Sequence, residues 1–106
     1  MADSLGEELS AALSNITSLI IKTESKSERM KLTKLQAQIA GQLQVFVDKV
    51  VDEALPEYEE ATAALSEANG EAEAAKKKLD KIAGTIKKFA DATDKLAALA
   101  GKVTGA

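Results

Sequence analysis

Apolar residues recur every three or four positions along almost the whole chain, and this spacing constrains the fold more than any other feature. A helix has about 3.6 residues per turn, so such a series places its members on one helical face. Residues that favour strands are scarce, since only 3% of the chain is aromatic. We therefore expect an all-α fold, organised as a single helical domain over residues 1–106.

The periodicity and the helix-end signals predict three helices. The first covers about residues 4–22. Ser25 and Glu28 form a capping box, in which the serine side chain accepts a hydrogen bond from a first-turn amide, so the second helix is expected from about residue 27 to 68. Pro56 either kinks this helix or ends it. The third helix is expected over about 71–101, after Asn69-Gly70, which is a strong turn dipeptide.

The chain can therefore reverse direction at Pro56 or at Asn69-Gly70, and its charged segments separate the two alternatives. Residues 22–34 and 76–88 are rich in lysine, whereas residues 52–73 are rich in acidic side chains. A turn at Asn69-Gly70 lays the second basic segment beside the acidic one, and a turn at Pro56 lays it beside the first basic segment. An exposed ion pair contributes at most about 1 kcal/mol, but the consistent sign favours the turn at Asn69-Gly70.

The expected architecture is an elongated three-helix bundle. Its short N-terminal helix packs on a long, coiled-coil-like antiparallel hairpin that turns at Asn69-Gly70. At 1.5 Å per residue the second helix would be about 60 Å long. The first helix can cover only part of such a hairpin, which leaves the alanine-rich end under-filled.

The residues that carry most enzyme chemistry are missing. The chain has no cysteine and no histidine, so it lacks a thiolate nucleophile, the commonest general base and the commonest transition-metal ligand. We predict that it is not an enzyme and expect no catalytic, cofactor-binding or metal-binding residues. A net charge of −3 argues against nucleic-acid binding, because proteins that bind phosphate backbones usually carry an excess of positive charge. Neither a signal-peptide pattern nor an apolar run of about 20 residues is present, so we expect a soluble, cytoplasmic protein.

The predicted function is structural: the chain forms a homo-oligomer or binds a protein partner's helix. The candidate interaction surface combines residues off the main apolar stripes with residues on the under-filled part of the hairpin: Ile21, Val47, Val51, Leu65 and Leu79. An alternative is a peripheral membrane-surface protein that uses a basic patch on the third helix. That patch consists of Lys76, Lys77, Lys78, Lys81, Lys87 and Lys88.

In length and composition the chain is similar to the small helical-hairpin proteins of bacterial secretion systems. The absence of tryptophan excludes the class of these proteins that carries a Trp-x-Gly turn. The resemblance is one of size and shape, so it implies a second alternative function and assigns no role to any residue.

Overall fold

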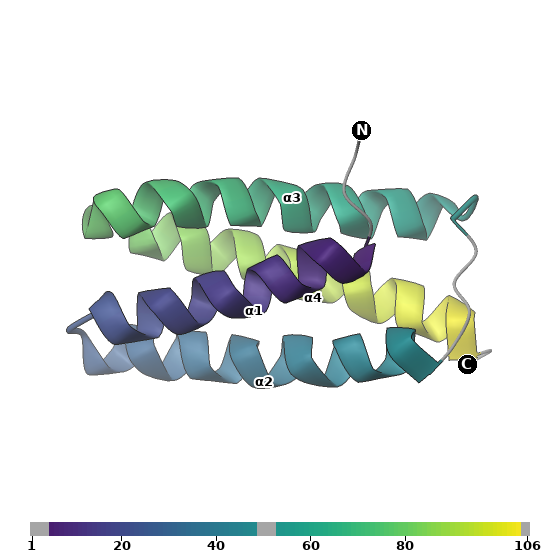
Figure 1. Ribbon diagram of the computed structural model, residues 1–106, viewed down its shortest axis with the longest axis horizontal. Helices are drawn as coiled ribbons and strands as arrows, with labels where there is room; N and C mark the ends of the chain where they lie inside the picture. Colours follow the sequence, from purple (N-terminus) through teal and green to yellow (C-terminus); the bar gives the residue numbers. More distant parts are fainter. Residues whose placement is uncertain (1–4, 49–52, 105–106) are drawn as a thin grey trace.

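The computed structural model describes residues 5–48 and 53–104, and in these stretches the chain forms four packed α-helices (Figure 1). They are α1 (Leu5–Lys22), α2 (Lys26–Asp48), α3 (Pro56–Lys77) and α4 (Ile82–Thr104). A 3-10 turn, η1 (Leu79–Lys81), leads into α4. The described residues contain no strand, and the all-α prediction is confirmed.

Local signals explain where α2 and α3 begin. The amide of Glu28 donates a hydrogen bond of 3.3 Å to Ser25 Oγ, which confirms the predicted cap of α2. Pro56 is the first residue of α3 and follows Leu55, whose backbone is extended (φ −66°, ψ 133°). Proline suits this position because amide protons in the first turn of a helix have no acceptor within the helix. A residue without an amide proton therefore loses no hydrogen bond there. Pro56 therefore marks a break between two helices.

The predicted turn at Asn69-Gly70 is wrong, because both residues lie inside α3. The single helix expected over 27–68 is two helices, α2 and α3, and the chain runs in opposite directions along them (Figure 1). It reverses again at Lys78, which is extended (φ −137°, ψ 100°), so the helix expected over 71–101 is also divided. Weak charge pairing between exposed side chains did not determine the fold; burial of four apolar stripes did.

The four helices are two antiparallel hairpins, α1 with α2 and α3 with α4, that both turn at the same end of the bundle, on the left in Figure 1. The hairpins pack with α1 parallel to α3 and α2 parallel to α4. Gln42 Nε2 on α2 donates to the carbonyl oxygen of Thr93 on α4 at 3.1 Å. At the opposite end of the bundle, α2 ends and α3 begins (Figure 1).

The molecule is compact, and the expected elongated shape is wrong. Its radius of gyration is 13.4 Å and its extents are 40 × 27 × 17 Å. A compact domain of this length has a radius of gyration of about 13 Å. The stretch expected as one helix of about 60 Å forms α2 and α3 instead. These two helices belong to different hairpins, and the packing of the hairpins on each other produces the compact shape.

The core combines large side chains on α1 with small ones on α3. Leu9 and Ile16 of α1 are fully buried, and four of the five buried apolar residues of α3 are alanines. Small residues let neighbouring helices approach closely, so the alanine stripe accommodates α1 along its length. The part of the chain expected to be under-filled is therefore covered by α1.

Candidate functional site

The predicted interaction residues do not form one surface. Ile21 is 80% exposed, Val47 is 69% exposed and Leu79 is 39% exposed. Ile21 and Leu79 lie at the hairpin-turn end, whereas Val47 lies in the last turn of α2 at the opposite end. Leu65 is fully buried, so its place on the predicted surface is wrong: α1 covers the alanine-rich stripe to which it belongs. Val51 lies outside the described residues.

The predicted basic patch occupies the end of α3, the turn and the start of α4. Two of its members are engaged with acidic side chains: Lys76 Nζ lies 3.1 Å from Glu73 Oε1, and Lys88 Nζ lies 2.5 Å from Glu67 Oε1. The remaining members are exposed: Lys77, Lys78, Lys81 and Lys87. The patch is therefore divided between ion-paired and solvent-facing lysines.

The ion pair between α4 and α3 alters the titration of Lys88. The hydrogen bond that its ammonium donates to Glu67, together with the attraction of that carboxylate, raises the pKa of Lys88 above its ordinary value. Because the pair is exposed to solvent, salt screens it.

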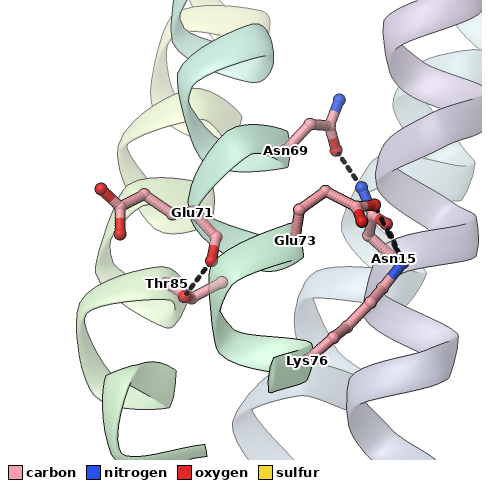
Figure 2. Close-up of polar contacts among 6 residues, drawn as sticks. All are labelled: Asn15, Asn69, Glu71, Glu73, Lys76 and Thr85. Atoms are coloured by element: carbon pink, nitrogen blue, oxygen red, sulfur yellow. Dashed lines mark hydrogen bonds and ion pairs between the residues drawn. The ribbon is translucent and has the colours of Figure 1, made fainter. Parts of the chain in front are cut away.

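A chain of buried polar side chains joins α1 to α3 (Figure 2). Asn69 Nδ2 donates to Glu8 Oε1 at 2.9 Å, and Asn15 Nδ2 donates to Asn69 Oδ1 at 2.9 Å. Lys76 Nζ then donates to Asn15 Oδ1 at 2.5 Å. Glu8, Asn15 and Asn69 are each more than nine-tenths buried. Each of these contacts pairs a donor with an acceptor, so the free-energy cost of burying these polar side chains is compensated.

This polar chain favours one alignment of α1 against α3. Glu8 and Asn15 each directly precede a core residue of α1, while Asn69 and Lys76 each directly follow a core residue of α3. Side chains at these flanking positions meet across parallel helices and specify their pairing. Sliding α1 by one turn would leave a buried carboxylate or amide without its partner. We interpret these polar side chains as fixing the alignment of α1 with α3, since they form hydrogen bonds with one another.

Sequence reasoning missed this polar chain because Asn69 precedes Gly70, a pair typical of turns. The signal that could have identified it is position: Asn15 adjoins Ile16 and Asn69 adjoins Ala68, both on apolar stripes. An asparagine at the edge of an apolar stripe is typical of helix pairing.

An open groove runs along the first half of α2, bordered by Ile20 of α1. Its volume is about 620 Å³. We call it the α1–α2 groove and define it by its lining residues: Ile20, Lys26, Arg29, Met30, Thr33, Lys34 and Ala37.

The α1–α2 groove combines an apolar surface with a basic border. On α2, Met30 and Ala37 lie about two turns apart on one face, and Met30 is 64% exposed. Lys26, Arg29 and Lys34 are also exposed on this helix, and no carboxylate lines the groove within the described residues. Such a surface can bury an apolar partner and attract negative charge.

The groove lies near the end of the bundle where both hairpins turn. The first basic segment, around α1 and α2, and the second, around α3 and α4, meet at this end (Figure 1). This is the juxtaposition that the sequence prediction treated as unfavourable. Exposed lysines tolerate it because their long side chains extend into water, where the repulsion is screened.

Within residues 5–48 and 53–104, no three acidic, histidine or cysteine side chains gather closely enough to hold a metal ion. No helix in these stretches is long and apolar enough to cross a membrane. No protein-family model, curated protein or solved structure matches the chain.

Proposed function

We propose that this chain is a non-enzymatic, cytoplasmic protein-interaction protein that receives a helix of a partner in the α1–α2 groove. The observation that carries the proposal is the groove itself, about 620 Å³ in volume, with the exposed Met30 on its wall. Its volume falls within the range of about 300–1,000 Å³ typical of ligand sites. A continuous apolar surface rimmed by polar residues is typical of docking sites, and in this groove Met30 and Ala37 are bordered by basic side chains.

The chemistry of the lining residues supports docking in preference to catalysis. Aliphatic and basic side chains dominate the groove, and Thr33 is the one hydroxyl among them. That hydroxyl donates to the carbonyl oxygen of Arg29 at 2.8 Å, inside its own helix. A nucleophile needs an adjacent general base, and neither a carboxylate nor a histidine is among the lining residues.

Site-specific photocross-linking in the cells that produce the protein tests this proposal. A benzoylphenylalanine replaces Met30 in one variant and Val47 in another, which is a matched control because Val47 is also an exposed aliphatic residue on α2. We expect a discrete adduct from position 30 and none from position 47. The adduct should be lost when Ala37→Glu is added to the groove and kept when Ala63→Glu is added on α3, where Ala63 is exposed.

The same adduct at both positions, or none at position 30, would contradict docking in the groove. Survival of the adduct in the Ala37→Glu variant would contradict it as well. Both alanines are exposed, so neither substitution removes a core contact. Circular dichroism melts of the two variants confirm that the fold is retained.

A further inference from the structure

We infer that the partner segment is an amphipathic helix whose apolar stripe is flanked by aspartate and glutamate side chains. This inference rests on the proposed function and specifies the chemistry of what enters the α1–α2 groove. It follows from the shape of the groove, from the charges on its border and from what a second copy of the chain would place there.

The shape of the groove favours a helix. Its α2 wall is formed at positions 26, 30, 33 and 37, which recur every three or four residues and so form one helical face. This face extends over about 16 Å at 1.5 Å per residue. A partner helix that lies along it would present its own apolar residues at the same spacing, as in other helix-in-groove complexes.

The border of the groove favours acidic flanks on that helix. Lys26, Arg29 and Lys34 line the groove and are exposed. Two acidic residues, Glu24 and Glu28, are near in sequence but do not line it. Complementary charges across an interface increase association rates and exclude partners of the wrong charge.

A second copy of the chain is a poor occupant. In a two-fold dimer the same patch meets itself, so the three basic side chains of one groove would face those of the other. The acidic helix of the chain, α3, cannot serve instead in the folded state. Its apolar stripe, represented by the fully buried Leu65, is already packed in its own core.

Three synthetic 18-residue helical peptides test the inference by fluorescence anisotropy with the full chain. All carry the same spacing of charged and uncharged positions: the first has a leucine stripe flanked by glutamate, the second has the same stripe flanked by lysine, and the third has the glutamate flanks with the stripe replaced by glutamine. We expect the first peptide to bind at least about tenfold more tightly than either of the others at low salt. The difference in affinity between the first peptide and the lysine peptide should be smaller at about 0.5 M salt, because salt screens the charges.

Variants of the chain locate the binding. Met30→Glu should reduce binding of the first peptide about tenfold, whereas Val47→Glu, at the other end of α2, should leave it unchanged. The triple variant Lys26→Glu, Arg29→Glu, Lys34→Glu should invert the preference, so that the lysine-flanked peptide binds more tightly. All five side chains are exposed, and thermal melts show whether each variant stays folded.

The failures of the two proposals are distinguishable. If both leucine peptides bind equally and Met30→Glu weakens both, the acidic flank is wrong and docking in the groove survives. If Met30→Glu affects neither peptide, or neither binds, the groove is not a helix-docking site and both proposals are overturned. Vesicles containing phosphatidylglycerol provide the last arm: binding to them that Met30→Glu abolishes, without binding of the first peptide, would assign the groove to a membrane surface.

Discussion

At the scale of single residues, Asn69 is the most informative side chain. Its amide joins Glu8 to Asn15 inside the bundle, with both hydrogen bonds at 2.9 Å. Asn69→Ala removes a donor from a carboxylate that is more than nine-tenths buried and an acceptor from Asn15. We predict a loss of about 1–3 kcal/mol in the free energy of unfolding, because the groups left behind stay buried without partners. Urea denaturation followed by circular dichroism measures it.

The matched control for Asn69→Ala is Ser66→Ala, an exposed position on the same helix. It should change the free energy of unfolding by no more than about 0.5 kcal/mol. If Asn69→Ala has an equally small effect, the polar chain does not hold α1 against α3.

The ion pair of Lys88 leads to a prediction on pH dependence. Its hydrogen bond and charge attraction to Glu67 raise the pKa of Lys88 in the folded state. A group with a raised folded pKa contributes its stabilisation fully below the unfolded value, about 10.4 for lysine, and loses it as the pH rises through the folded value. The melting temperature of the unmodified chain should therefore exceed that of Glu67→Gln at about pH 8, and the difference should disappear once the pH has risen through the raised pKa of Lys88. Thermal melts of both proteins in parallel measure it; a difference that is constant with pH would contradict the assignment.

At the scale of helices, Gly70 decides between the predicted turn and the observed helix. Gly70 lies inside α3, and a Cβ placed on it meets no atom within 4 Å. Alanine has a higher helix propensity than glycine, so Gly70→Ala should raise the free energy of unfolding by about 0.5–1 kcal/mol. Gly41→Ala in α2 is the matched control, since Gly41 is also helical and unobstructed. Chemical denaturation measures both, and a loss of stability at position 70 alone would indicate a turn there.

The sequence predicted the helical segments better than the connections between them. Apolar spacing is a local property, and the helix that it predicts over about residues 4–22 corresponds to α1. The connections were misjudged because the same spacing continues from Ala75 through Leu79 to Ile82, across the turn between α3 and α4. No glycine or proline marks that turn. A weak indication was available, because lysines are favoured at the carboxyl end of a helix, where Lys76 and Lys77 lie.

The candidate site could be predicted only in part. Lys26, Arg29 and Lys34 are visible in the sequence as a basic segment, and Met30 lies within it. The groove, however, forms only once Ile20 of α1 is placed beside α2. Sequence reasoning identified the neighbouring Ile21 as off the main stripe but assigned the other surface residues from an incorrect hairpin. The exposed apolar and basic residues of α2 form a site only because α1 packs beside them.

At the scale of the whole molecule, the direction in which each helix runs determines which faces become surfaces. It places α2 parallel to α4, so both basic segments lie at the end where the hairpins turn (Figure 1). The acidic residues that open α3, including Glu57 and Glu59, lie at the opposite end. The acidic and the second basic segments do lie in one hairpin, as the ion pair of Lys88 with Glu67 shows, but that hairpin turns at Lys78 and not at Asn69-Gly70.

This arrangement can be tested directly because the chain has no cysteine of its own, so a thiol-specific cross-linker reacts only at the cysteines that are introduced. Lys34 and Gln38 of α2 line one groove together with Ile86 and Ala90 of α4. Parallel packing predicts that two cysteine pairs, at positions 34 and 86 and at positions 38 and 90, are both joined by a short bis-maleimide.

A hairpin that reverses at Asn69-Gly70 would instead bring position 38 beside position 101. In the observed fold, Gly101 lies eleven residues beyond Ala90 on α4, about 16 Å further along the helix, which is too far for a short linker. Mass spectrometry of the intact chain should therefore detect intramolecular cross-links in the first two variants and single-ended modification in the variant with Gln38→Cys and Gly101→Cys. The reverse pattern would overturn the four-helix topology, and with it the groove that depends on α1 lying beside α2.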